Sequence, residues 1–119
     1  MRDSPFIDST SFHAKELAPG VTARLVSGER IMLSEVTIEP DGVVPLHSHP
    51  HEQAGVCLNG EFDLEVAGEV RRIKAGDYYL IPGGTVHAAR GVGSKAVTLD
   101  IFSPPREDYL PGAESKLRS

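Results

Sequence analysis

The chain has 119 residues, 39% of them hydrophobic and 24% charged, a size and composition that fit one folded domain over residues 1–119. The net charge is −5 and the 12 basic residues are scattered, so the sequence lacks the basic stripe that is typical of nucleic-acid-binding proteins. It has no apolar run near the ~20 residues that span a bilayer, no apolar signal segment in its first residues and a single cysteine, so we expect a cytoplasmic protein with neither a nucleic-acid nor a membrane partner.

Short segments with β-branched residues and period-two alternation follow one another from residue 21 onward, separated by glycine or proline. In chain order we predict strands at residues 21–27, 31–39, 53–58, 61–67, 69–74, 78–81, 85–90 and 96–102. The Asn59-Gly60 pair between two of these segments is a hairpin signal. Helix is expected only around residues 12–17 or as a short turn after residue 107.

So many short strands in one small domain predict an all-β fold, either a sandwich or a jelly-roll barrel. The barrel core is expected at about residues 20–103, between an N-terminal arm and a C-terminal tail. An open jelly-roll has exposed strand edges, which are liable to pair with other chains. We therefore expect a homodimer.

The stretch HSHPHEQ, residues 47–53, contains three histidines. His47 and His49 are two positions apart, so on a strand both imidazoles point to one face. Extending this alternation along the strand places Gln53 on the same face and Glu52 on the opposite one. Two imidazoles and an amide on one face suit a metal ion, and an exposed polar stretch without a metal is the alternative.

Two other histidines bear on this site. His51 has the same parity, but Pro50 cannot donate a ladder hydrogen bond and is expected to turn the chain, so His51 is not counted as a ligand. His87 follows the glycine-rich turn PGGTV. A strand that starts there would bring a third imidazole nitrogen from a separate part of the chain.

Two motifs resemble those of the cupins. GVVPLHSHPHEQAGVCLNG resembles the first cupin motif, with a glycine, an HxH pair, an acidic or amide residue four positions on, and a final glycine. GDYYLIPGGTVHAARG resembles the second. The resemblance implies a double-stranded β-helix, which is the cupin jelly-roll barrel. It also implies a divalent transition metal held by His47, His49, Gln53 and His87.

The C-terminal segment LDIFSPPREDYL, residues 99–110, carries a narrower resemblance. Together with HSHPHEQ it is similar to the KdgF-type cupins, the pectin-degradation proteins that ketonise unsaturated monouronates. In that group, the positions matched by Asp100, Phe102 and Arg106 are catalytic and contact the substrate. Most metal-binding cupins have glutamate where this chain has Gln53.

Three imidazoles and one amide are all neutral ligands, so a bound dication would keep its full charge. Such an ion is a strong Lewis acid toward a carboxylate or enolate oxygen, and it is harder to oxidise, which disfavours oxygen activation. The donor set does not distinguish Ni, Zn, Fe, Mn and Cu.

In the segment AVTLDIF, Asp100 and Phe102 share one strand face, which suggests a cavity with one carboxyl group in it. Partial burial would raise the pKa of Asp100 toward neutrality. Arg106 would hold a substrate carboxylate through its planar guanidinium group. The alternatives are an outward-facing Asp100, a solvated Arg106 and a Phe102 that belongs to the core.

Three other side chains carry expectations of their own. Tyr78 and Tyr79 are neighbours on one predicted strand and must face opposite ways, so at most one of them lines the cavity. Cys57 lies on an apolar strand and is expected to be a small buried hydrophobe.

The sequence thus predicts an enzyme that converts 4,5-unsaturated monouronates, released by pectin or alginate lyases, to linear 4-deoxy-5-keto uronates. Its partner would be a small anionic sugar acid. A cupin dioxygenase and a non-catalytic sugar-binding cupin are the alternatives.

Overall fold

The structure is a computed structural model that describes residues 4–110. Strands account for nearly all of the regular structure in this part of the chain, and two short 3₁₀ helices, η1 (Ser9–Ser11) and η2 (Glu107–Tyr109), account for the rest. The strands are β1 (His13–Ala18), β2 (Val21–Ser27), β3 (Met32–Ile38), β4 (Val43–His47), β5 (Glu52–Asn59), β6 (Glu61–Val66), β7 (Glu69–Lys74), β8 (Tyr78–Ile81), β9 (His87–Gly91) and β10 (Ala96–Ser103). The predicted all-β class and the short turn after residue 107 are confirmed.

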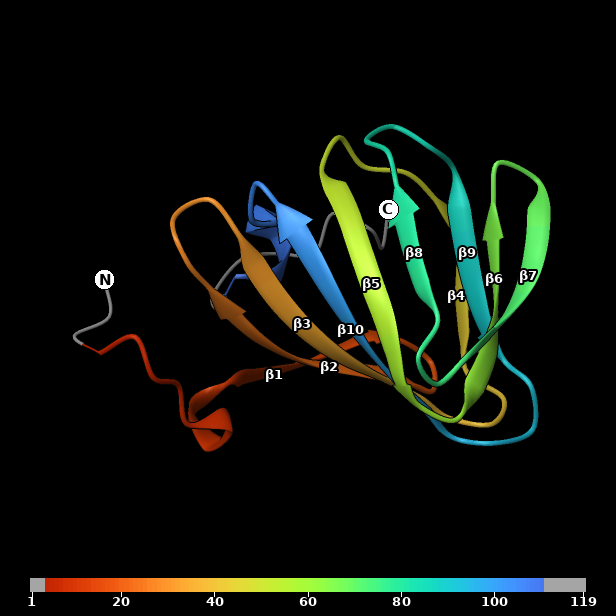
Figure 1. Cartoon of the computed structure of the whole chain (residues 1–119), viewed down its shortest axis with the longest axis horizontal. Coiled ribbons are helices and arrows are strands. Elements are labelled where there is room, and N and C mark those ends of the chain that lie inside the picture. The colour runs from red at the N-terminus through yellow and green to blue at the C-terminus, as the bar shows by residue number, and fades with distance from the viewer. Residues whose placement is uncertain (1–3, 111–119) are drawn as a thin grey trace.

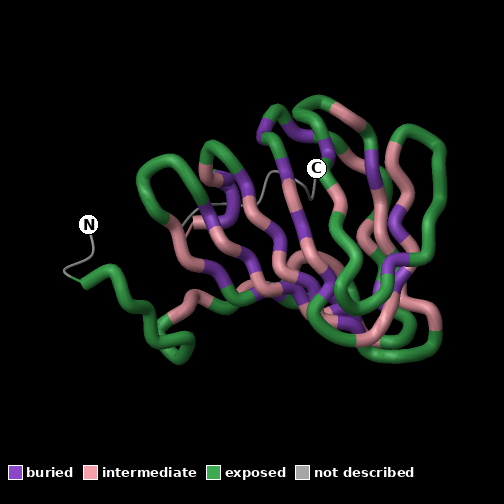
Figure 2. Tube along the Cα trace, viewed as in Figure 1, coloured by how far each residue is buried: buried purple, intermediate pink, exposed green. Residues whose placement is uncertain are grey.

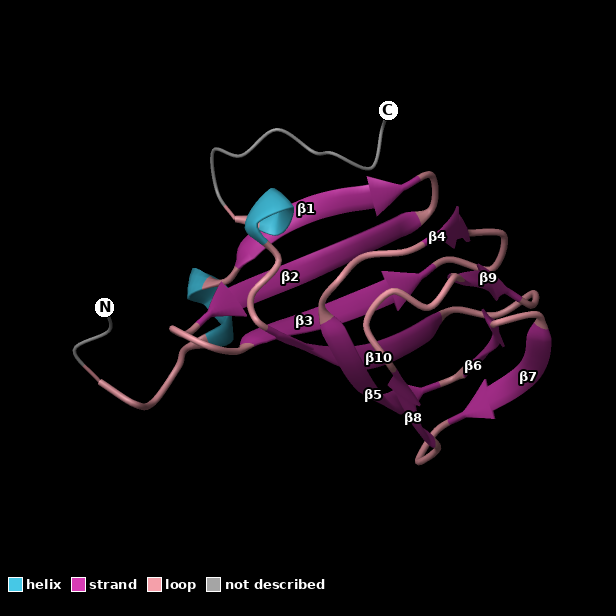
Figure 3. Cartoon of the chain, turned by 90° about the horizontal axis from the view of Figure 1, so that it is seen from above, coloured by secondary structure: helices cyan, strands magenta, loops and turns pink. Residues whose placement is uncertain are grey.

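The strands form two antiparallel sheets (Figures 1 and 3). The larger sheet has six strands in the order β1-β2-β3-β10-β5-β8, and the smaller has four in the order β4-β9-β6-β7. Strands distant in the sequence are therefore neighbours, as where β10 lies between β3 and β5. This two-sheet arrangement matches the jelly roll that the sequence predicts.

The core lies between the two sheets, because alternate residues on each strand point inward. Along β3 and β10 every second residue is buried, and Figure 2 shows the same alternation along the trace. Phe62 of the smaller sheet and Met32 of the larger are each 1% exposed in this core. Cys57 is buried in it too, as predicted. Over residues 4–110, no helix is long and apolar enough to cross a membrane.

The helix expected around residues 12–17 is wrong, because His13–Ala18 forms β1. This strand pairs antiparallel with β2 along the edge of the larger sheet. HAKELA contains good helix formers, but six residues are too few to sustain an isolated helix in water. Pairing with β2 satisfies the backbone instead, so a non-local contact overrides the local preference.

The histidine-rich stretch also differs from the expected single strand. His47 ends β4 in the smaller sheet, whereas Gln53 is the second residue of β5 in the larger sheet. The chain crosses between the sheets at residues 48–51, around Pro50. Asn59-Gly60 is likewise a corner between sheets rather than a hairpin, since β5 and β6 belong to different sheets. Gly60 has a φ of +73° there, which favours glycine.

Candidate metal centre

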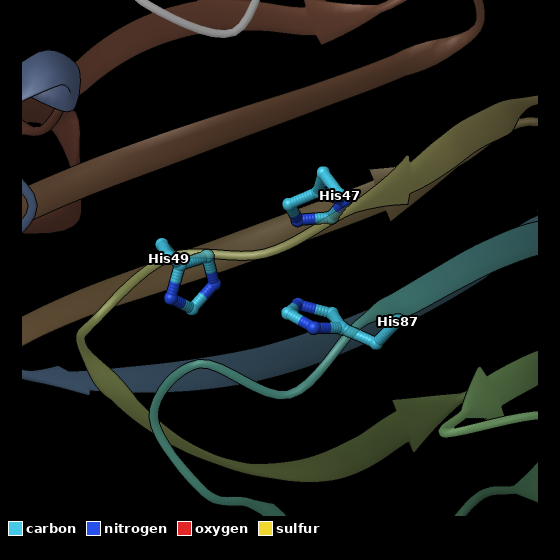
Figure 4. A group of neighbouring side chains, drawn as sticks. All are labelled: His47, His49 and His87. Carbon is cyan, nitrogen blue, oxygen red and sulfur yellow. The ribbon is translucent and has the colours of Figure 1, made fainter.

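His47 and His87 lie directly opposite each other where β4 ends and β9 begins. They are paired in the strand register, and their ring centroids are 4.3 Å apart. His49, in the loop after β4, places its ring centroid 4.9 Å from that of His87. One nitrogen from each ring lies within 4.8 Å of the other two, and the three rings converge (Figure 4). This histidine cluster (His47, His49 and His87) suits a metal ion.

Backbone carbonyls fix the orientation of each imidazole in the cluster. The Nδ1 atoms of His47, His87 and His49 lie 2.9, 2.8 and 3.1 Å from the carbonyl oxygens of Pro45, Thr85 and His51, respectively. A carbonyl only accepts, so each Nδ1 carries the proton and each Nε2 keeps a lone pair. Hydrogen bonds of this kind orient metal-ligating histidines.

The Nε2 atom of His87 is a buried acceptor. It has no hydrogen-bond partner among residues 4–110. Leaving a buried acceptor unpaired is unfavourable by about 1–3 kcal/mol. A cation at the centre of the cluster would satisfy this atom, so the residues present fit the predicted metal.

Gln53 rather than Glu52 faces the cluster. Gln53 is 7% exposed, whereas Glu52 points to solvent. The Gln53 Oε1 atom lies 3.2 Å from His49 Nε2. With the His49 proton on Nδ1, both atoms are acceptors, and two ligands with bonds of about 2.1 Å to one cation lie at a comparable separation. This geometry suits Gln53 as a fourth ligand, although the ligand set stays a prediction.

The reason for the Gln53 placement differs from the predicted one. Strand parity from His47 does not extend to Gln53, because the chain turns between β4 and β5 and the two residues lie in different sheets. Gln53 instead faces inward because its strand places it in register with Phe102 of β10. The glutamine therefore reaches the cluster from the sheet opposite His47 and His87.

Burial lowers the pKa of all three cluster histidines. The pKa of His49 falls to about 4, with the Arg106 guanidinium and the other two imidazoles adding to the effect of burial. For His47 and His87, burial is again the largest cause and the hydrogen bonds from Nδ1 oppose it. Imidazoles that are neutral at pH 7 bind a cation without first losing a proton.

Asp100 faces the same interior from β10. It is 8% exposed, so the alternative of an outward-facing charge is wrong. Burial raises its pKa to about 6, and hydrogen bonds from Tyr79 and Gln53 together with the charge of Arg106 oppose this rise. A carboxyl group with this pKa is present in both protonation states close to neutrality, which suits proton transfer.

Phe102 connects the cluster to the apolar core. Its ring packs edge-on against His49, with the centroids 5.7 Å apart, and against Tyr109 at 5.9 Å. It is 3% exposed. Phe102 therefore belongs to the core and lines the cavity at once, and its predicted contact with substrate stays a prediction.

Arg106 is buried, with 2% of its surface exposed, so the solvated alternative is wrong. Its Nη2 and Nε atoms donate to Asp108 at 2.9 and 3.4 Å, and its Nη1 atom donates to the Tyr109 hydroxyl at 2.9 Å. The guanidinium also stacks 3.9 Å from the centroid of the Tyr109 ring. A guanidinium group has five N–H groups. Three of them make these contacts, so within residues 4–110 two remain to bind a ligand.

Tyr79 is the site residue that the sequence reasoning did not select. Its hydroxyl donates to Asp100 at 2.5 Å and lies 2.7 Å from Thr98 Oγ1. Tyr78 is 81% exposed, so only one of the two tyrosines lines the cavity, as expected. The pattern YYLI did not reveal which, because both of its faces are apolar; the structure places Tyr79 on the same face as the buried Ile81.

These side chains line a cavity of about 50 Å³ between the sheets. Its polar lining includes His47, Gln53, His87, Asp100 and Arg106, and apolar side chains such as Leu64 complete the wall. Only a small group enters so confined a space. The cavity therefore suits part of a small molecule, and Arg106 in its wall favours an anionic one.

Known proteins resemble the chain in both sequence and structure. "Pectin degradation protein KdgF" of Dickeya dadantii is 28% identical over 98 residues, which cover 81% of this chain and 89% of that protein. "H2HPP isomerase" of Bacillus subtilis is 31% identical over 98 residues, covering 80% of this chain but only 41% of that protein. The solved structure of KdgF from Halomonas sp. superimposes with a TM-score of 0.81 at 28% identity, covering 90% of this chain and 99% of the other.

The fold alone is shared with an RmlC-like cupin from Shewanella frigidimarina, whose structure gives a TM-score of 0.82 at 23% identity over 91% of this chain and 97% of the other. The family model described as "Cupin domain" matches residues 34–102. The matched region contains the histidine cluster, Gln53, Asp100 and Phe102. The chain therefore belongs to the cupin family.

Proposed function

We propose that this protein is a metal-dependent enzyme that ketonises 4,5-unsaturated monouronates to linear 4-deoxy-5-keto uronates. Asp100 carries the proposal, because a buried carboxyl group with a pKa of about 6 faces the same cavity as His47 and His87 of the histidine cluster. The similarity to a pectin degradation protein over most of both chains supports a sugar acid derived from pectin. The similarity to an isomerase supports a reaction that rearranges its substrate without redox change.

In the proposed reaction the sugar ring opens to an aldehyde and an enol. The enol then loses a proton from the oxygen on C5 and gains one at C4, so the atoms of substrate and product balance. Asp100 is the group that gives the proton to C4 and takes one back from the enol, directly or through water. Its pKa lets it serve in both directions near neutral pH.

The other residues bind and orient the substrate. The two N–H groups of Arg106 that have no partner within the described residues 4–110 would hold the substrate carboxylate, and Phe102 would exclude water beside Asp100. A divalent cation, held by the histidine cluster and Gln53, would supply Lewis-acid stabilisation of negative charge on the substrate oxygens. Since all four protein ligands are neutral, they would not reduce the positive charge of the cation.

The test is the loss of absorbance from the conjugated unsaturated uronate, followed with freshly generated substrate from pectin and alginate lyases. Metal-loaded protein is expected to accelerate this loss, and the metal-free form to be much slower. Asp100→Asn is expected to lower kcat by roughly 100-fold or more, whereas Glu16→Gln, an exposed carboxylate on β1, leaves kcat unchanged.

Two results would replace this proposal with one of the alternatives. The metal-loaded protein could bind the sugar acid and yet leave each of these unsaturated uronates at its uncatalysed rate. That result would identify a binding cupin. Oxygen uptake by an iron- or copper-loaded sample in the presence of the sugar acid would identify a dioxygenase.

A further inference from the structure

Tyr79, Gly55 and Asp100 lie in one row across three neighbouring strands. Gly55 of β5 is directly opposite Tyr79 of β8 on one side and directly opposite Asp100 of β10 on the other. Residues that lie opposite in adjacent strands point to the same face of the sheet. Two strand spacings separate the backbones of Tyr79 and Asp100 by about 10 Å, so the tyrosine must reach across β5 to touch the carboxyl group.

The glycine at position 55 makes this reach possible. A Cβ atom built on Gly55 would overlap the Tyr79 ring, at Cζ, Cε1 and the hydroxyl oxygen. The φ angle of Gly55 lies outside the left-handed region, so the backbone itself would accept any residue. What requires glycine here is the phenol that lies over it.

The hydroxyl of Tyr79 ends between two partners. It donates to Asp100 Oδ1 at 2.5 Å and lies 2.7 Å from Thr98 Oγ1. A phenol has one proton, which Asp100 accepts here; Thr98 also has one proton, for which the Val56 carbonyl oxygen, 3.2 Å from Thr98 Oγ1, competes with the Tyr79 oxygen. Burial and the neighbouring Asp100 raise the pKa of Tyr79 far above its ordinary value, which keeps the phenol protonated and donating.

We infer that Tyr79 is a positioning residue: lying across Gly55, it holds the Asp100 carboxyl group in one orientation toward the cavity. This inference rests on the proposed function, in which Asp100 moves the proton to and from the sugar acid. By fixing Oδ1, Tyr79 removes the freedom of the carboxyl group to rotate away from the reacting carbon. A displacement of about 1 Å in a reacting group is enough to slow a reaction by roughly 100-fold.

The first experiment compares Tyr79→Phe with Tyr78→Phe. Both remove one hydroxyl from β8, but Tyr78 is exposed and touches neither Asp100 nor the cavity. Tyr79→Phe is expected to lower kcat roughly 10- to 100-fold with KM changed less than about threefold, and Tyr78→Phe to change neither. An unchanged kcat in Tyr79→Phe, or a raised KM at unchanged kcat, would overturn the inference, the latter because it would make Tyr79 a substrate-binding residue.

Epistasis separates positioning from a general structural role. If Tyr79 acts through Asp100, adding Tyr79→Phe to Asp100→Asn is expected to have no further effect on kcat. A further loss equal to that of the single variant would contradict action through Asp100. Gly55→Ala leaves the hydroxyl present but displaces it, and is expected to lower kcat as Tyr79→Phe does. Gly55→Ala with wild-type kcat would show that the row of three residues is unimportant.

A readout independent of activity distinguishes failure of this inference from failure of the proposed function. If wild-type protein does not accelerate ketonisation, the proposed function fails, and crystal structures of wild type and Tyr79→Phe then decide the inference alone. The Asp100 carboxyl group is expected to keep one orientation in wild type and to rotate or split into two in Tyr79→Phe, with metal content equal in both. An identical Asp100 orientation in the two structures would refute the positioning role.

Discussion

His47 and His87 face each other across β4 and β9 with ring centroids 4.3 Å apart, and each ring donates from Nδ1 to the carbonyl oxygen of the residue two positions earlier. The repeated contact aims both Nε2 atoms at one point. His49 reaches that point from the loop after β4, where its Nδ1 donates to the carbonyl oxygen of His51 instead. The site thus depends on local backbone geometry as much as on strand pairing.

The convergence of Nε2 atoms predicts that removing one imidazole weakens metal binding. His87→Ala is expected to lower metal affinity by at least about 10- to 100-fold, because losing a ligand has a larger effect than losing a residue that only orients a ligand. Elemental analysis of purified protein and competition with a chelator measure this affinity. His13→Ala, in β1 and outside the cluster, serves as the control. Equal metal content in His87→Ala and wild type would contradict the prediction that the histidine cluster binds a metal.

The neutral amide of Gln53 predicts the effect of adding a charge to the site. Gln53→Glu is expected to bind the metal more tightly and to ketonise more slowly, because an anionic ligand cancels one unit of the cation's charge and weakens it as a Lewis acid. Chelator competition measures the affinity and the absorbance assay measures kcat. Glu52→Gln, the reverse change at the exposed neighbour, is expected to alter neither. Faster turnover in Gln53→Glu would contradict the Lewis-acid role.

Burial of Asp100 predicts a dependence of stability on pH. Its pKa rises from 3.8 to about 6 in the folded, metal-free protein, so between these values the native state binds more protons than the unfolded state. The contribution of Asp100 to the free energy of unfolding therefore falls as the pH rises through this window. A shift of about two units corresponds to about 3 kcal/mol. Asp100→Asn has no group that titrates here. As the pH rises through this window, its free energy of unfolding is therefore expected to increase relative to that of wild type by up to that amount.

Chemical denaturation of both metal-free proteins, from about pH 4 to about pH 7, measures this difference. The cluster histidines act in the opposite sense. His49, for example, has its pKa lowered from 6.5 to about 4, so its contribution to stability grows as the pH rises through that range. Because both proteins contain the same histidines, their effect cancels in the comparison. A stability difference that does not change with pH would show that Asp100 ionises normally.

The buried pair of Arg106 and Asp108 predicts a large loss of stability when one partner is neutralised. The side chains are 2% and 6% exposed, with Nη2 and Oδ2 2.9 Å apart. Asp108→Asn leaves the guanidinium buried without its counter-charge, which is expected to lower the free energy of unfolding by about 3–5 kcal/mol. Glu107→Gln, at the exposed neighbour, is expected to lower it by less than about 1 kcal/mol. Urea denaturation compares the two, and equal losses would contradict this account of Arg106.

The edge of the larger sheet predicts association. β1 is an edge strand, and the arm that leads to it extends away from the sheets (Figure 1). Phe6, in this arm, is 86% exposed. Open edges and exposed apolar side chains favour pairing between copies. We expect a homodimer in sedimentation velocity experiments, and a weaker one for Phe6→Ser. A monomer at the highest attainable concentration would contradict this prediction.

Local pattern was enough to identify most of the strands, and the resemblance of three sequence segments to known cupins selected the candidate site residues. Glycine and proline ended the strands where the sequence predicted, because turn geometry depends on a few adjacent residues. The alternation of Thr98, Asp100 and Phe102 placed all three on one face of β10, because the period of a strand is local too. The HxH spacing and His87 indicated a metal centre through their chemistry, before any contact between them was known.

Tertiary structure decided what depends on residues far apart in the chain. It made His13–Ala18 a strand by pairing it with β2, and it turned Asn59-Gly60 into a corner between sheets. It brought Gln53 to the histidines from the opposite sheet, and it joined Tyr79 to Asp100 across Gly55. These contacts arise from strand order and register, which the free energy of the whole core selects and which no short segment encodes alone.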